Sequence, residues 1–254
     1  MNLQVSEATL VALLLGTTRA TGFVLMAPPF NSKSIAVPVK AAFALALSVA
    51  VSAHLAATLP AITPGFLLIS AITELVIGAA LGFVVQLLFS AVQMAGDIID
   101  VTGGFSLQPA YDPLAMTQNA AIGRLHYLLA ITLLFSSGGH LLIVRGFVMS
   151  YQGLPLGGAV PTAQLAHVVM TAFSMMFLAA LQIAGPMVAV LLLADVALAL
   201  MSRAAPALNI FQMGFPVKIM LTLTMLGLTF PLLPPALDML MQNAARAIMS
   251  LKSG

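Results

Sequence analysis

Asp97 and Asp100 are two carboxylates close together in the sequence, and such a pair could catalyse proton transfer. Asp97 and Asp100 are three residues apart, which places them on one side of a helix, where one carboxyl group could donate a proton and the other accept one. An intramembrane hydrolase would need such a pair. However, ordinary placement near the end of a helix explains both residues, and the sequence has no HExxH, GxSxG or phosphate-binding GxxxxGK motif. We therefore predict that the chain is not an enzyme.

The histidines do not form a metal site by sequence. Each stands alone, without a second ligand at helical spacing, and the chain has no cysteine that could supply a thiolate. The four are His54, His126, His140 and His167. The sequence therefore predicts no metal centre and no cofactor, and it gives no support for redox chemistry.

The composition of the chain is that of an integral membrane protein. Of the 254 residues 61% are hydrophobic and 6% are charged, with a mean hydropathy of +1.11, so the chain cannot cover itself with polar surface. Its nine bases are spread singly, without the basic run that nucleic acid or an anionic membrane surface would need. The first apolar block contains Arg19 and lacks a basic segment before it, so we expect it to be retained rather than cleaved as a signal peptide.

Six apolar blocks predict an all-α membrane protein with several kinked or broken helices. The blocks cover residues 8–27, 41–59, 66–92, 125–144, 165–194 and 219–233. The fifth contains Gly185 and Pro186, so we expect a kinked or discontinuous helix there. The last is short for a membrane span and predicts part of a hairpin or a re-entrant element.

The charged residues inside these blocks need partners. Arg19 either extends to the membrane interface or faces protein, because a charge at the bilayer centre is costly. Glu74, Gly78 and Gly82 fall on one helix face, and the two glycines let a second backbone approach, so this face predicts helix packing.

Three more charges follow the fifth block among apolar neighbours. Asp195, Arg203 and Lys218 are expected to make buried polar contacts with one another or with a partner chain. Intramembrane charges and broken helices also occur along the substrate pathways of ion-coupled transporters, so a small-molecule transporter is an alternative interpretation.

The longest polar gap, residues 94–123, lies between the third and fourth blocks. Gly103, Gly104, Pro109 and Pro113 favour a loop in its middle. Large apolar side chains distinguish this loop from a solvated linker, which leaves two interpretations: an apolar-tipped loop between membrane segments, or a plain connector. These side chains are Phe105, Leu107, Tyr111, Leu114 and Met116.

The whole chain resembles the FliR family of flagellar export-gate proteins, whose injectisome relatives form the SctT group. The resemblance is most specific in the run DVALALMSRAAPALNIF at residues 195–211, which contains Asn209 and is followed by Phe215, Pro216 and Lys218. It extends to the run RATGF that begins at Arg19 and to residues 74–82 and 96–113. Departures are Ala207, where glutamine is common, and Asp97, where glutamate is frequent.

The resemblance implies an inner-membrane subunit of a type III secretion export gate in the flagellar basal body. Its implied partners are FliP-like, FliQ-like and FlhB-like proteins and the exported flagellar proteins, with an injectisome gate as the alternative. About residues 1–190 would be a FliP-like part and about residues 191–254 a FliQ-like hairpin. Phe105, Leu107, Pro109, Tyr111, Leu114 and Met116 would belong to a channel plug, and Glu74, Asp195, Arg203, Asn209 and Lys218 to buried or interface contacts.

Overall fold

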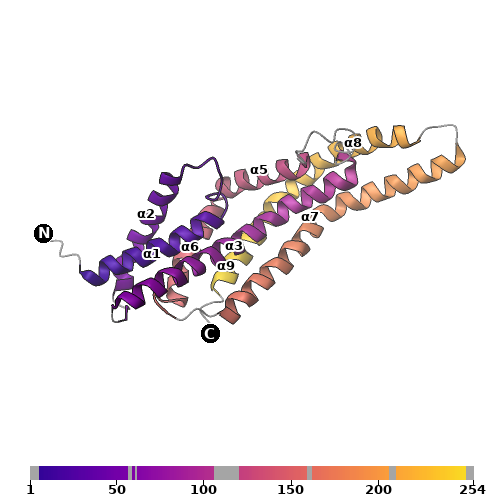
Figure 1. Cartoon of the computed structure of the whole chain (residues 1–254). Helices are drawn as coiled ribbons and strands as arrows, with labels where there is room; N and C mark the ends of the chain where they lie inside the picture. Colours follow the sequence, from indigo (N-terminus) through magenta and orange to yellow (C-terminus); the bar gives the residue numbers. More distant parts are fainter. Residues whose placement is uncertain are drawn as a thin grey trace, which may run out of the picture. The chain divides into compact units, whose positions relative to one another are not determined.

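All secondary structure in the described residues is helical, which confirms the predicted all-α class (Figure 1). The structure is a computed structural model that describes residues 6–56, 59–60, 62–105, 120–158, 162–205 and 210–249. The helices are α1 (Glu7–Met26), α2 (Val37–Leu55), α3 (Pro64–Gly103), α5 (Ala121–Ser136), α6 (Gly139–Gly153), α7 (Thr162–Ala204), α8 (Ile210–Thr229), the short 3-10 helix η3 (Phe230–Leu232) and α9 (Leu233–Met249).

Local sequence signals explain where several helices begin and end. Ser6 caps α1, because its hydroxyl accepts a hydrogen bond from the Thr9 amide at 3.2 Å. Thr63 accepts from the Phe66 amide at 3.2 Å at the start of α3, directly before a proline in the first turn. Pro28 follows the last residues of α1 and prevents the helix from continuing.

Three helices are long and apolar enough to cross a membrane among the residues described: α1, α3 and α7. Two bent pairs of helices, α5 with α6 and α8 with η3 and α9, would add a fourth and a fifth span if each pair is one broken span. Each pair is bent by more than 40° at a break of at most four residues. The α2 helix is apolar but shorter. These segments correspond to the six apolar blocks of the sequence.

Of the two alternatives expected at Gly185 and Pro186, a kinked or a discontinuous helix, the discontinuous one is wrong, because α7 is one helix of 43 residues that passes through both. A proline removes one backbone N–H and leaves the rest of the hydrogen-bond ladder, so a helix in a membrane protein can continue past it. The same holds for Pro216, since α8 begins at Ile210 and is 20 residues long. The last block predicted from the sequence, residues 219–233, therefore began too late, because the helix already starts at Ile210.

Two further boundaries differ from the sequence prediction. The fourth block contains the pair Gly138-Gly139, which can kink a helix, and the chain does more than kink there: α5 ends before Gly138, whose φ of 73° is left-handed, and α6 begins directly after it. In contrast, α3 does not end at residue 92 but continues to Gly103, so the first third of the polar gap is helical. Asp97 and Asp100 therefore lie on the last turns of a helix.

The chain forms two compact units. Unit 1 contains residues 1–88, 138–174 and 241–254, and unit 2 contains residues 89–137 and 175–240. In unit 1, α1 lies beside α2 (Figure 1), and Phe23 stacks on Phe147 of α6 with ring centroids 4.6 Å apart. These contacts form an apolar core around α1, the first part of α3, and α6.

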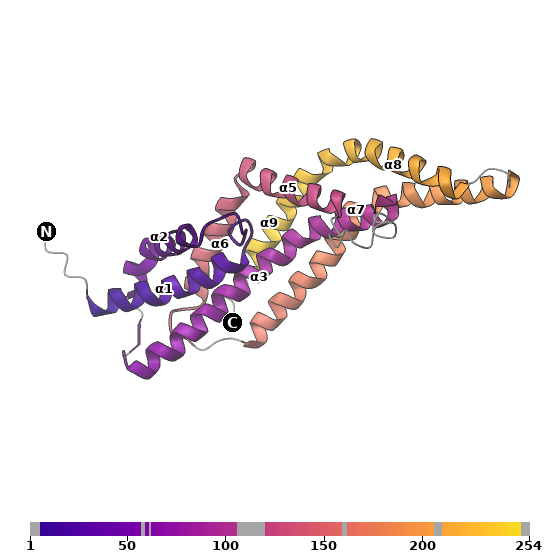
Figure 2. The same cartoon turned by 45° about the horizontal axis from the view of Figure 1, so that its top comes forward.

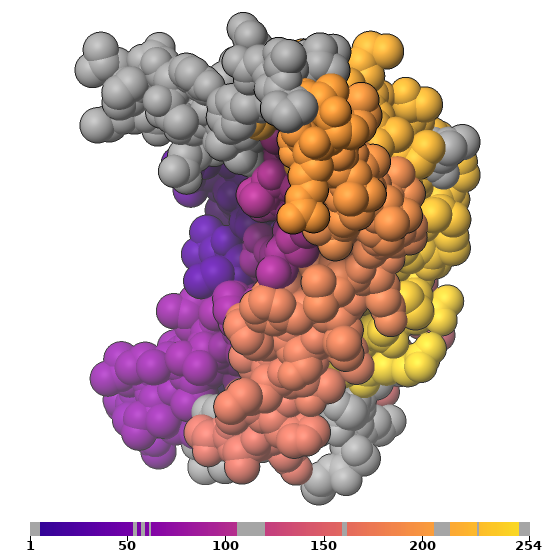
Figure 3. Space-filling model, turned by 90° about the vertical axis from the view of Figure 1, so that its right-hand side faces the viewer, coloured from indigo at the N-terminus to yellow at the C-terminus, as the bar shows by residue number. Residues whose placement is uncertain are grey.

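The core of unit 2 joins the last part of α3, α5, α7 and α8. Its buried members are Ala95, Ile99, Ile122, Ala180, Ala184, Met187, Leu191 and Leu226. Beyond this core the last part of α7 and α8 run side by side, as Figure 2 shows, and their side chains meet on the face drawn in Figure 3. The last part of α7 and α8 thus form a hairpin within unit 2.

Candidate functional site

Unit 1 contains a fully buried charged group, the side chain of Arg19, which has no exposed surface. Its Nε donates a hydrogen bond to Glu74 Oε2, and this ion pair joins α1 to α3. The side chain of Glu74 is 1% exposed. Arg19 thus faces protein and does not extend to the membrane interface.

The residues after α6 complete this polar cluster. Arg19 Nη2 donates to the Leu154 carbonyl at 2.8 Å, and the Gly157 amide donates to Glu74 Oε1 at 3.1 Å. The Arg19 guanidinium lies 4.4 Å from the ring centroid of Tyr151. Each end of the ion pair therefore has a second partner, as a buried pair requires.

The glycines predicted for helix packing lie at the crossing of α1 and α3. A Cβ atom at Gly78 would overlap the Arg19 carbonyl group, and one at Gly82 would lie 2.6 Å from the Phe23 carbonyl oxygen. On the α1 side, a Cβ at Gly22 would lie 2.8 Å from the Ala79 amide nitrogen. The two backbones are thus in direct contact, which only glycine permits, and this close approach brings Arg19 to Glu74.

Asp195 and Lys218 form an ion pair across the hairpin in unit 2. Lys218 Nζ lies 2.9 Å from Asp195 Oδ1 and 3.0 Å from Oδ2, and it links α7 to α8. The side chain of Asp195 is 48% exposed and that of Lys218 is 15% exposed. Arg203 is exposed at the end of α7, and Asn209 lies outside the described residues. The structure therefore brings together two of the three charges named from the sequence.

Replacing Lys218 with methionine is expected to reduce the amount of membrane-integrated chain. The substitution leaves Asp195 without its counter-charge on an apolar hairpin, and a lone aspartate costs about 3 kcal/mol at a helix centre on insertion scales. The measurement is the level of membrane-integrated chain at equal transcript level. Combining it with Asp195→Asn, which removes both charges, should restore much of the loss, and Arg145→Met, at an exposed cation of α6, is the control. A double variant no better than Lys218→Met would contradict the interpretation.

A second polar cluster lies in unit 2, where α3 ends and α5 begins, on either side of the predicted plug loop. Phe105 packs against the apolar core of the unit, whereas Leu107, Pro109, Tyr111, Leu114 and Met116 lie outside the described residues. Asp100 Oδ2 accepts a hydrogen bond from the Ile122 amide at 3.1 Å. The carboxylate thus connects the helix before the loop to the helix after it.

Asp97 and His126 lie beside this contact. A Cβ atom at Gly123 would overlap Asp97 Oδ1, so the carboxylate lies where any larger residue would place its side chain. The Nδ1 atom of His126 is 2.9 Å from the Ile122 carbonyl oxygen in the same helix. Within the part of the chain that the structure describes, no group of three or more potential ligands could hold a metal ion.

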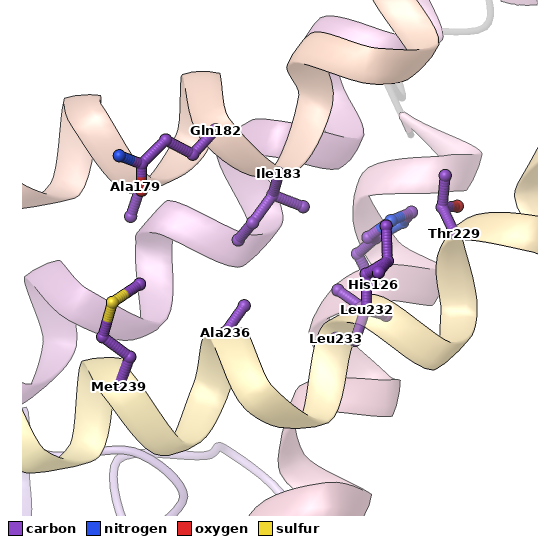
Figure 4. Close-up of a pocket in the computed structure, with 9 residues that line it drawn as sticks. All are labelled: His126, Ala179, Gln182, Ile183, Thr229, Leu232, Leu233, Ala236 and Met239. Carbon is purple, nitrogen blue, oxygen red and sulfur yellow. The ribbon is translucent and has the colours of Figure 1, made fainter.

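One cavity of about 120 Å³ lies within unit 2 (Figure 4). His126 and Thr229 lie at one end of it, and Ala179 and Met239 at the other. The remaining lining residues are Gln182, Ile183, Leu232, Leu233 and Ala236. Most of this lining is apolar, and its polar members are His126, Gln182 and Thr229.

Two contacts of these clusters were missed from the sequence, namely the pairing of Arg19 with Glu74 and the capping of α5 by Asp100. The available signal for the first was that both charges interrupt apolar blocks, so that each needed a partner. The signal for the second was that the start of α5 has no serine, threonine, aspartate or asparagine at its cap position, which is Ala120.

These features define the class of the protein. A chain with several apolar spans and with ion pairs between helices, Arg19 with Glu74 and Asp195 with Lys218, is a polytopic helical membrane protein. More specifically, the family model for bacterial export proteins, family 1, matches residues 10–244, and the chain belongs to this family. The resemblance to export proteins seen in the sequence is thus confirmed.

Several relatives support the same assignment. The chain is 32% identical over 218 residues to the flagellar biosynthetic protein FliR of Escherichia coli. This match covers 85% of this chain and 83% of the relative. It is 30% identical to that of Aquifex aeolicus over 90% of this chain and 88% of the relative. The Yop proteins translocation protein T of Yersinia pestis is 32% identical over 57% of this chain and 56% of the relative.

Proposed function

We propose that this chain is a membrane subunit of the flagellar type III secretion export gate, the channel through which unfolded flagellar proteins leave the cell. The observation that carries the proposal is the match to export proteins over almost the whole chain, together with long matches to flagellar FliR proteins. The same matches give the alternative of a small-molecule transporter no support.

Exposed apolar side chains support a place within a larger assembly. Only 17% of the apolar window of α7 is buried in the isolated chain, against 61% for α3. Large side chains such as Met170, Leu193 and Leu200 are more than 60% exposed on α7. This surface must be covered by lipid or by other chains. We propose FliP-like, FliQ-like and FlhB-like subunits as those chains and the inner membrane as their location.

The division of the chain into a FliP-like part, about residues 1–190, and a FliQ-like hairpin, about residues 191–254, is part of this proposal. The hairpin of α7 and α8, joined by Asp195 and Lys218, supports it, because two apolar helices held by one ion pair form a unit that can pack on neighbouring hairpins. Arg203 and Asn209 are proposed as contacts to those neighbours.

A virulence injectisome is the second candidate system. The similarity to the Yersinia translocation protein favours it, but that match covers a smaller part of the chain than the longest flagellar matches. The deciding experiment is deletion of the gene in the source bacterium and its return on a plasmid. Loss and restoration of hook and filament proteins outside the cell are expected. Normal flagella in the deletion strain would overturn the flagellar proposal.

We also propose that the loop predicted from the sequence between Gly103 and Gly123 closes the conduit at rest. A pore wide enough for an unfolded protein would leak ions, and apolar groups in a narrow lumen oppose ion passage by excluding water. Replacing residues 107–116 with a shorter Gly-Ser linker is expected to increase ion leak and sensitivity to small toxic molecules. A second variant keeps the loop length and changes three apolar residues to serine. It should also increase ion leak; the residues are Leu107, Tyr111 and Leu114.

The control for the loop variants is the wild-type chain at matched levels of the assembled gate. A plain connector outside the pore would leave membrane tightness unchanged at those levels, and this result would remove the plug proposal without affecting the assignment to the flagellar gate.

A further inference from the structure

The cavity of unit 2 has one polar end and one apolar end (Figure 4). His126 of α5 and Thr229, the last residue of α8, lie at the polar end, and Ala179 and Met239 lie at the other. Its volume is about 120 Å³. In another protein, an apolar cavity of about 150 Å³ binds benzene. The cavity of unit 2 is therefore close to the size that a single ring needs.

Both side chains at the polar end already donate their hydrogens to backbone carbonyl groups. The Nδ1 atom of His126 lies 2.9 Å from the Ile122 carbonyl oxygen, which can only accept, so Nδ1 carries the hydrogen. The ring is 1% exposed and a buried charge is costly, so the neutral imidazole is favoured, and its Nε2 atom is then an acceptor. The Thr229 hydroxyl donates to the Leu226 carbonyl at 3.0 Å and keeps only lone pairs. The polar end thus offers acceptors.

The rest of the wall favours an uncharged occupant. Among the lining residues, all of which the structure describes, none is an acid, a lysine or an arginine. Gln182, Leu232 and Met239 border the cavity and are also exposed at the surface, so a small molecule can reach the cavity from outside. The other apolar members of the wall are Ile183, Leu233 and Ala236.

We propose that this cavity binds a small, uncharged molecule of the class of phenols, with an apolar ring and one hydrogen-bond donor. The ring would fill the apolar end, and the hydroxyl would donate to His126 or Thr229. An apolar occupant of the same shape would leave both acceptors without a partner, which costs free energy in a buried site. The inference does not depend on the proposed export function, because it uses only contacts within unit 2.

The test compares phenol with toluene, which has the same shape but carries a methyl group in place of the hydroxyl. The measurement is the midpoint of thermal unfolding of the full, detergent-extracted chain at a series of free ligand concentrations in water. A ligand that binds only the folded chain raises this midpoint. Phenol is expected to bind about fivefold more tightly than toluene, the factor that one net hydrogen bond typically contributes.

Two variants separate the cavity from other places where these compounds could dissolve. Ala236→Leu fills the cavity from α9 and should abolish the response to both compounds, and Ala179→Leu fills it from α7 if Ala236→Leu does not fold. Thr229→Val keeps the shape of the side chain and removes one acceptor, so it should reduce the preference for phenol. The matched control is Gly185→Ala on α7, where no atom lies within 4 Å of the new Cβ, and its response should equal that of wild type.

Three results would overturn the inference. The first is no change of the midpoint with phenol in the wild-type chain. The second is an unchanged response in the cavity-filling variants, which would place the binding elsewhere on the chain or in the detergent. The third is equal binding of phenol and toluene, which would indicate a hydrocarbon occupant such as a lipid chain.

Discussion

Replacing Glu74 with alanine is expected to destabilise the chain by about 3 to 5 kcal/mol, because the substitution leaves the Arg19 guanidinium buried without its counter-charge. The Leu154 carbonyl and the Tyr151 ring would remain as its partners, and neither carries a negative charge. The Gly157 amide would also lose its acceptor. The measurement is the midpoint of thermal unfolding of the detergent-extracted chain, together with the yield of monodisperse protein.

The control for this prediction removes both charges at once. Arg19→Met combined with Glu74→Met replaces the buried pair with apolar side chains, and such replacements are often neutral or stabilising in other proteins. The double variant should therefore be more stable than Glu74→Ala. If the double variant were as unstable as the single one, the cost would come from lost packing and not from an unpaired charge.

Replacing Gly78 with leucine is expected to separate α1 from α3 and to prevent stable folding of unit 1. Even the Cβ atom of the new side chain would overlap the backbone of Arg19, which cannot move aside as a flexible side chain could. Overpacking typically costs about 1 to 3 kcal/mol, and a clash with backbone belongs at or above the upper end of that range. The readouts are chain yield and incorporation into the export complex.

The matched control is Gly65→Ala, at the beginning of the same helix, where no atom of the described residues lies within 4 Å of the new Cβ. This variant should behave as wild type, whereas Gly78→Ala should already be impaired. Equal tolerance of Gly78→Ala and Gly65→Ala would show that the close approach of the two backbones is not required.

Composition determined the class of this protein without help from its fold. With 6% charged residues, the chain has to place most of its surface against lipid or protein, and spans of helical length satisfy their own backbone groups there. Charged side chains in apolar surroundings were expected to need partners in the same way. Glu74 interrupts an apolar block, and Asp195 and Lys218 lie among apolar neighbours between the fifth and sixth blocks. For Arg19 the sequence left two alternatives, a protein partner or the membrane interface. The specific order of residues in 195–211 was enough to suggest the family.

Helix boundaries were predicted less well because single residues do not decide them. Gly138 ends a helix where its φ is left-handed, but Gly185 and Pro186 lie within a continuous one. In both places the sequence shows the same kind of residue. Packing against neighbouring helices decides whether a helix continues or the chain turns at such a residue. Local helix propensity does not predict this packing.

The choice of partners was decided only by the tertiary structure. Arg19 and Glu74 are 55 residues apart, and they meet because the glycines of α1 and α3 let two backbones touch. Asp100 can cap α5 because the backbones of α3 and α5 touch at Gly96 and Gly123, close to the first turn of α5. The sequence shows that a buried charge requires a partner, but only the arrangement of the helices in space determines which group is near enough to be that partner.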